Sequence, residues 1–146
     1  MNTYIYIEDM IVKIDKEKLL FKVESLNSKN EEISKIGSLD VKSYINYWNI
    51  EGKYILFSTS NGYFLISKYI SYFTYEHLIK DASLDSNERL SILSEKGILR
   101  IIKDNYSNYF MVEIFNIFDI KHNEKISDIM KKNNFRYIPF VIDFRV

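Results

Sequence analysis

The sequence predicts an α+β domain, in which hairpins build a mostly antiparallel sheet of about seven strands with about three short helices. Three observations predict this class. Apolar and polar residues alternate in short runs, an Asn61-Gly62 pair separates two such runs, and the apolar spacing becomes helical in segments after residue 75. With 146 residues, of which 47% are hydrophobic, residues 1–146 are expected to form a single globular domain.

The first half of the chain is predicted to form strands. The loop at residues 15–18 suits a four-residue hairpin, and Asn61-Gly62 is the strongest hairpin signal because both residues tolerate positive φ. In the predicted strand at residues 41–48, Tyr44 and Trp48 are expected on one face. The predicted strands are residues 3–7, 10–14, 20–24, 41–48, 53–58 and 63–67.

The second half mixes helices and strands. Short helices are expected at residues 75–80, from Asp85 or Ser86 to about Lys96, and at residues 124–132. In the second of these, Asp85 or Ser86 is the N-cap, Leu90 and Leu93 face inward, and Gly97 ends the helix. Strands are expected at residues 98–103, 109–115 and 135–146, where Pro139 favours an edge position or a bulge. Residues 28–37 are ambiguous, since Asn30 could cap a further short helix.

The composition limits the chemistry. The chain has no Cys and only two His, so disulfides and thiolate zinc sites are excluded, and no cofactor is expected. No internal repeat, signal peptide or transmembrane run is visible, which predicts a cytoplasmic protein without a membrane partner. Abundant Ile, Lys, Asn and Tyr indicate an AT-rich genome, such as that of a low-GC bacterium, a phage or a mobile element.

The charge balance argues against a general nucleic-acid binder. Lys plus Arg and Asp plus Glu each number 20, so the formal net charge is zero. A local nucleic-acid patch remains an alternative, at Lys121, Lys125, Lys131, Lys132 and Arg136. Asp128 is spaced to pair with two of these lysines, which favours an ordinary solvated helix face.

A metal-dependent nuclease is the enzymatic alternative. Asp104, Asp119 and Lys121 match an upstream acid followed by acid-x-Lys, in which two carboxylates hold a metal and Lys stabilises developing charge. The acid-x-Lys tripeptide occurs three times, close to the number expected by chance. His77 and His122 are far apart in the sequence, so neither is expected to bind a metal.

The aromatic residues point towards recognition. Tyr69, Tyr72 and Tyr75 recur at every third position, and Tyr44 and Trp48 could extend the same patch. Core packing is the competing interpretation, although Tyr is enriched at interface hot spots. These five residues are the predicted partner-binding set.

The sequence resembles no family that its residues identify. Its size, its inferred AT-rich origin and its lack of catalytic motifs favour a small, non-catalytic protein-binding module. An immunity protein or inhibitor that occludes a partner surface fits this description. The alternatives are a metal-dependent nuclease and a nucleic-acid-binding module, and the sequence does not specify an oligomeric state.

Overall fold

The computed structural model describes residues 2–26, 39–103, 106, 108–114 and 135–143, and within them the regular structure consists of strands only. The predicted α+β class is therefore wrong, and the fold is all-β. The strands are β1 (Asn2–Ile7), β2 (Met10–Asp15), β3 (Leu20–Ser25), β4 (Leu39–Lys42), β5 (Asn46–Ile50), β6 (Tyr54–Ser58), β7 (Tyr63–Ile66), β8 (Ile70–Phe73), β9 (Ile79–Leu84), β10 (Leu90–Ser94), β11 (Ile98–Lys103), β12 (Tyr109–Ile114), β13 (Phe135–Ile138) and β14 (Phe140–Asp143).

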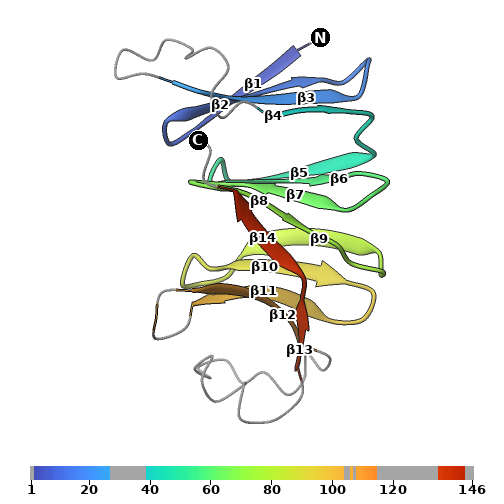
Figure 1. Ribbon diagram of the computed structural model, residues 1–146, viewed down its shortest axis with the longest axis vertical. Coiled ribbons are helices and arrows are strands. Elements are labelled where there is room, and N and C mark those ends of the chain that lie inside the picture. Colours follow the sequence, from blue (N-terminus) through green and yellow to red (C-terminus); the bar gives the residue numbers. More distant parts are fainter. Residues whose placement is uncertain (1, 27–38, 104–105, 107, 115–134, 144–146) are drawn as a thin grey trace. The chain divides into compact units, whose positions relative to one another are not determined.

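The strands form three sheets, each built on four consecutive strands that run as an up-and-down meander (Figure 1). Sheet 1 has the order β1-β2-β3-β4. Sheet 2 has the order β14-β8-β7-β6-β5, and sheet 3 the order β13-β12-β11-β10-β9. The chain end therefore adds one edge strand to sheet 3 and one to sheet 2, and Pro139 lies between these two edge strands.

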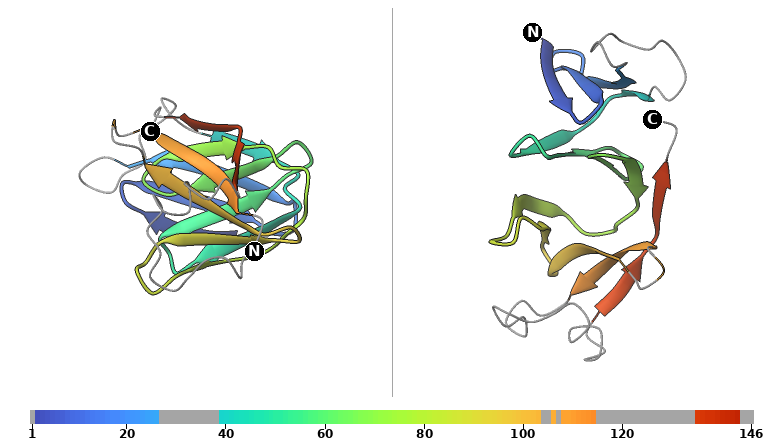
Figure 2. Two further views of the ribbon diagram at one scale, coloured as in Figure 1. Left: turned by 90° about the horizontal axis from the view of Figure 1, so that it is seen from below. Right: turned by 90° about the vertical axis from the view of Figure 1, so that its left-hand side faces the viewer.

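The chain divides into two compact units. Unit 1 comprises residues 1–73 and 141–146 and holds sheets 1 and 2, whereas unit 2 comprises residues 74–140 and holds sheet 3 (Figure 2). The single domain expected from the chain length stays a prediction. Among the described residues, no helix is long and apolar enough to cross a membrane.

The core of unit 1 lies between sheets 1 and 2. Phe21 on β3 stacks on Phe57 on β6, with ring centroids 3.6 Å apart and ring planes 10° apart. Both rings are fully buried, because alternate residues of each strand turn towards the facing sheet. Aliphatic side chains surround the pair, namely Ile7, Met10, Val12, Ile14, Val23, Ile55, Ile66 and Ile70.

One turn device recurs at the central hairpin of each sheet. Asp15 closes the β2–β3 hairpin, Thr59 the β6–β7 hairpin and Ser94 the β10–β11 hairpin. In each case a side-chain oxygen accepts the backbone N–H groups two and three residues later, at 3.1 to 3.3 Å. These residues stabilise turns because their short side chains reach nearby backbone donors. The three meanders are thus repeats of structure, although no repeat is visible in the sequence.

The first two predicted helices are strands and turns instead. Residues 75–80 lead into β9, and residues 85–96 contain a turn followed by β10. Asp85 caps the β9–β10 turn and not a helix, since its Oδ1 accepts the backbone N–H groups of Asn87 at 2.8 Å and Arg89 at 2.9 Å. Gly97 likewise closes a hairpin, because its N–H donates to Ser94 Oγ. The third predicted helix, residues 124–132, and the ambiguous residues 28–37 lie outside the described residues.

The Asn61-Gly62 hairpin is confirmed, but its turn does not have a positive φ at both of these residues. Four residues, 59–62, connect β6 to β7, and among them only Gly62 has a positive φ, of 157°. A Cβ at Gly62 would lie 2.8 Å from the carbonyl oxygen of Phe73 and closer still to the Tyr72 hydroxyl group. Glycine is therefore required here both by backbone conformation and by space.

Asp85 gives unit 2 an acid-sensitive contribution to stability. Although burial raises the pKa of Asp85, the N–H groups of Arg89 and Asn87 and the guanidinium of Arg100 hold that pKa below its ordinary value of 3.8. Because the folded-state pKa is depressed, this stabilisation is present above pH 3.8 and is lost as pH falls through the folded-state pKa.

We expect Asp85→Asn to lower the free energy of unfolding of unit 2 by about 1 kcal/mol at neutral pH. The difference from wild type should disappear in acid, where the wild-type carboxylate is protonated. Hydrogen exchange of the β9–β11 amides against pH measures this, with Asp81→Asn at an exposed carboxylate as the control. A destabilisation that persists unchanged in acid would contradict the electrostatic account.

Candidate functional site

The five residues of the predicted partner-binding set do not gather on one surface. Tyr44 is only 3% exposed and lies in the core of unit 1, where its ring meets Phe57 edge-on at 5.5 Å between centroids. Burial, followed by nearby Tyr47 and Asp15, raises the pKa of its hydroxyl group. The predicted strand at residues 41–48 is interrupted between β4 and β5, where Ser43 has a φ of 62°, and Tyr44 lies in this interruption with its side chain buried.

The other aromatic residues of that set in unit 1 are half-buried. Trp48 lies opposite Leu56 in the β5–β6 register, whereas Tyr72 lies opposite Phe64, which packs against the core. Trp48 and Tyr72 therefore occupy opposite faces of sheet 2. Tyr69 precedes β8, and the Tyr72 hydroxyl donates a 2.6 Å hydrogen bond to the carbonyl oxygen of Asn61.

Tyr75, the fifth member of the set, belongs to a polar cluster in unit 2. Its hydroxyl group donates to Glu113 Oε2 and lies 2.8 Å from Ser94 Oγ. Glu113 on β12 is only 1% exposed, so its carboxylate requires compensating donors. Arg136 on β13 supplies the second one, with its Nε 3.0 Å from Glu113 Oε1. The antiparallel register places Glu113 directly opposite Arg136.

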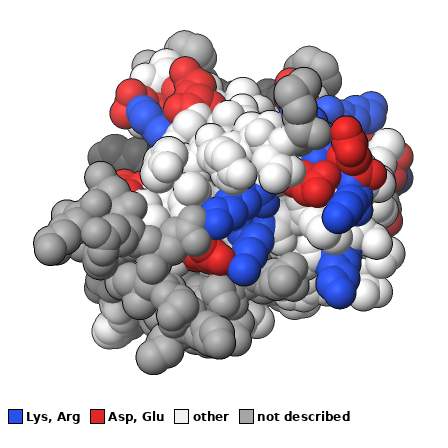
Figure 3. Space-filling view, turned by 90° about the horizontal axis from the view of Figure 1, so that it is seen from above, with Lys and Arg blue, Asp and Glu red and all other residues white. Residues whose placement is uncertain are grey.

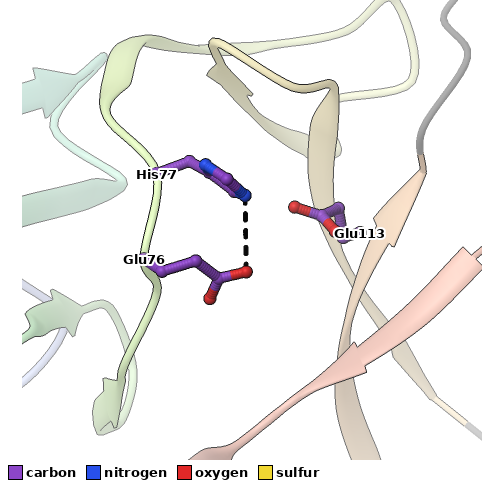
Figure 4. Close-up of side chains that lie close together, drawn as sticks. All are labelled: Glu76, His77 and Glu113. Atoms are coloured by element: carbon purple, nitrogen blue, oxygen red, sulfur yellow. Dashed lines mark ion pairs between the residues drawn. The ribbon is translucent and has the colours of Figure 1, made fainter.

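Two further side chains of the segment before β9 extend this cluster (Figure 4). Arg136 Nη2 donates to Glu76 Oε1, and His77 Nε2 lies 3.4 Å from the same oxygen. One potential ligand atom from each of Glu76, His77 and Glu113 falls within 4.8 Å of the others. One histidine and two carboxylates form a donor set that many divalent metals accept.

The cluster already contains its own cation. The Arg136 guanidinium contacts both carboxylates, and its hydrogen bond to Glu113 raises the pKa of Arg136. The pKa of Glu76 is lowered, first by its own backbone N–H and then by Arg136. Burial and the hydrogen bond to Glu113 raise the pKa of Tyr75 far above 10.0, so at neutral pH it is a donor and not a base. These contacts fit a network that fixes β13 against β12.

The residues of the two alternative functions lie mostly outside the described residues. The structure does not describe the three residues of the predicted nuclease site, namely Asp104, Asp119 and Lys121. It also leaves out His122 and most of the predicted basic patch, namely Lys121, Lys125, Lys131 and Lys132. Arg136 is the described member of that patch, and its guanidinium is engaged by Glu76 and Glu113. The hypotheses of a nuclease and of a nucleic-acid-binding module stay predictions.

The outer face of sheet 1 carries an aromatic surface that was not predicted from the sequence. Tyr4 and Tyr6 on β1 are 55% and 62% exposed and lie two positions apart, so both project from the face opposite the core. A shallow hollow of about 200 Å³ opens beside Tyr4, with Asn2, Lys13, Asp15, Leu20 and Lys22 contributing to its lining. We call this the sheet 1 outer surface.

Charges on the sheet 1 outer surface are paired. Tyr4, Lys13 and Lys22 lie side by side across β1, β2 and β3. Glu24 bridges the two lysines, at 2.8 Å from Lys22 Nζ and 3.4 Å from Lys13 Nζ. Figure 3, which looks onto the part of the chain that holds sheet 1, shows Lys and Arg side chains interleaved with Asp and Glu and with uncharged side chains. The surface is therefore mixed and not basic.

The signal for Tyr4 and Tyr6 was present in the sequence as strict alternation. In residues 3–7 every second position is β-branched, and the two tyrosines occupy the positions between. That pattern indicates a strand with tyrosines on one face, but it does not predict which face is exposed to solvent. The Tyr75–Glu113–Arg136 network left no such signal, because its members are separated by 38 and 23 residues.

Comparison of the chain with known proteins returned nothing similar: no protein-family model, no curated protein and no solved structure matches it.

Proposed function

We propose that this chain is a non-catalytic protein-binding module whose partner docks on the sheet 1 outer surface. The observation that carries the proposal is the exposure of Tyr4 and Tyr6 next to each other on that surface. Tyrosine supplies a large apolar contact area with a polar tip, and it is enriched among residues that dominate binding energy. We further place the protein in the cytoplasm, as an immunity protein or inhibitor.

The physical mechanism is occlusion. The two tyrosine rings cover apolar surface of the partner, and the hollow beside Tyr4 accepts one protruding side chain. At about 200 Å³ the hollow is smaller than the 300–1,000 Å³ usual for small-molecule sites, which favours a partner side chain over a free ligand. The Lys13–Glu24–Lys22 ion pairs give the rim a polar contact that favours a defined orientation.

Paired lysines favour a protein over a nucleic acid at this surface. A nucleic acid requires unneutralised cations, since its affinity comes largely from the release of counterions by Lys and Arg. Glu24 contacts both lysines of the row, and Asp15 also lines the hollow. A mixed surface of this kind suits a partner that is itself mixed in charge.

Site-specific photo-crosslinking in host cells tests the proposal. A photoreactive phenylalanine analogue replaces Tyr6, and in a matched chain it replaces Tyr106, which is 86% exposed but belongs to unit 2. We expect the probe at position 6 to give one dominant protein adduct that position 106 does not give. Equal adducts from both positions, or adducts to nucleic acid alone, would contradict the proposal.

The adduct's identity then allows a binding measurement with the purified partner. Because each tyrosine acts as an anchor, Tyr4→Ser and Tyr6→Ser should each weaken binding by about tenfold or more, corresponding to about 1.4 kcal/mol. Tyr106→Ser removes a more exposed ring and should leave the affinity unchanged. An affinity that is indifferent to both β1 substitutions would rule out this surface.

A further inference from the structure

Strand β1 leaves one side of its backbone without a strand partner among the described residues. It is the first strand in the order of sheet 1, and all six of its residues are in register with β2 on the other side. Its sequence, Asn-Thr-Tyr-Ile-Tyr-Ile, contains no charge, proline or glycine. Such an edge is a template for pairing with another strand, because it presents N–H and C=O groups in an extended row.

The other edge strands show more of the features that oppose such pairing. Sheets usually protect their edges with charges, bulges or short strands. A charged residue occurs in β4, β9, β13 and β14, and the pairing of β9 with β10 also has a register shift. The β5 strand is uncharged but has five residues, two of them Asn. Among the described edge strands, β1 is the longest one without a charged residue.

We propose that β1 pairs in antiparallel fashion with β1 of a second copy of this chain, joining two copies of sheet 1 into one continuous sheet. This goes beyond the proposed function, because it assigns an occupant to the edge of the sheet and not to its outer face. A two-fold interface requires a self-complementary surface, and a strand without charge brings no like charges together when it meets itself.

The alternation of β1 limits the possible registers. Residues opposite each other in an antiparallel pair share a face, so each tyrosine must face another outward residue. Of the registers that meet this condition, the one with Ile5 opposite Ile5 of the second copy pairs both tyrosines with tyrosines, because Tyr4 then lies opposite Tyr6 of the second copy. Thr3 then lies opposite Ile7, which continues the inner apolar face across the junction. Aromatic cross-strand pairs are among the favourable ones in sheets.

The area available sets the strength of the dimer. A tyrosine that is about half exposed can bury roughly 100 Å² more, so four of them contribute about 400 Å² beyond the backbone contacts. Stable interfaces bury about 1,200–2,000 Å² in total, which places this one at or below the low end. The expected assembly is therefore a reversible dimer whose population rises with protein concentration.

A single introduced cysteine tests the register. Because the wild-type chain has no Cys, Ile5→Cys gives a chain in which any disulfide must join two copies. Directly opposed residues of an antiparallel pair have Cα atoms about 4.5–5.5 Å apart, within the range that a disulfide spans. Mild oxidation should convert Ile5→Cys to a covalent dimer, whereas Tyr106→Cys should stay monomeric. Equal dimer yields from both positions, or none from position 5, would overturn the proposal.

A charge exchange keeps the proposal testable without oxidation. Tyr4→Lys with Tyr6→Lys places two ammonium groups opposite each other twice, and sedimentation should show self-association at least tenfold weaker than in wild type. Tyr4→Lys with Tyr6→Glu carries as many new charges but pairs opposite ones across the interface, so association should return. Equal loss in both double variants would exclude this register, and an unaltered Trp48 emission spectrum confirms that each variant is folded.

The two proposals fail separately. If the chain that carries the probe at position 6 is monomeric in sedimentation and is crosslinked to a different protein, the dimer is excluded and the outer surface remains the docking site. If the probe is crosslinked only to a second copy of this chain, the dimer stands and the outer surface is excluded as a docking site for a different protein.

Discussion

Phe57→Ala should lower the free energy of unfolding of unit 1 by about 4 kcal/mol, within the range for a buried phenylalanine truncated in a close-packed core. Phe57 is fully buried, stacks on Phe21 and also contacts the ring of Tyr44. Its removal leaves a cavity between two sheets whose backbones are held apart by the remaining side chains, so the site has little capacity to collapse.

Urea unfolding followed by tryptophan fluorescence measures this effect on one unit. Trp48 is the single tryptophan of the chain and lies in β5, so its emission reports on unit 1. Tyr6→Ala removes a ring of similar size from the same unit, but that ring is 62% exposed, and its loss should cost below about 1 kcal/mol. Similar midpoint shifts for the two variants would mean that the Phe21–Phe57 stack does not anchor the core.

The strands were largely predictable because strand burial has a period of two that survives in the sequence. The expected runs at residues 3–7, 10–14 and 20–24 correspond to β1, β2 and β3, and the hairpin at Asn61-Gly62 is present. The first two predicted helices were wrong for a physical reason. Asp85 and Gly97 are compatible with both a helix and a hairpin. Asp85 accepts hydrogen bonds from nearby backbone N–H groups in either structure, and Gly97 allows the chain to turn after either one.

The candidate sites needed information that no local pattern holds. Tyr44 and Trp48 share a face only in an unbroken strand, and Tyr44 lies before β5 begins at Asn46, so the strand alternation does not reach it. The Glu113–Arg136 contact depends on the β12–β13 register, which joins residues that are 23 positions apart. Tyr4 and Tyr6 were readable as a pair on one face, but the other face of β1 had to be placed against sheet 2 before their exposure could be inferred.

Arg136→Met should destabilise unit 2 by about 3 kcal/mol, because it leaves a buried carboxylate without its cation. Glu113 is 1% exposed, and in this variant its carboxylate would still accept a hydrogen bond from the Tyr75 hydroxyl group. Arg89→Met is the matched control. The side chains of Arg136 and Arg89 are 42% and 41% exposed, but Arg89 pairs with a partner at i,i+4, and such pairs contribute only about 0.3–0.5 kcal/mol. Hydrogen exchange of the β11 and β12 amides measures the two effects.

A second substitution in the Arg136→Met variant separates lost charge from lost packing. Without the guanidinium, the buried carboxylate of Glu113 has no cation to offset the cost of its burial. Adding Glu113→Gln to Arg136→Met removes the buried charge, keeps an acceptor for Tyr75, and should recover most of the loss at neutral pH. If the double variant is as unstable as Arg136→Met at every pH, the contribution of Arg136 is its packing against β12 and not its charge.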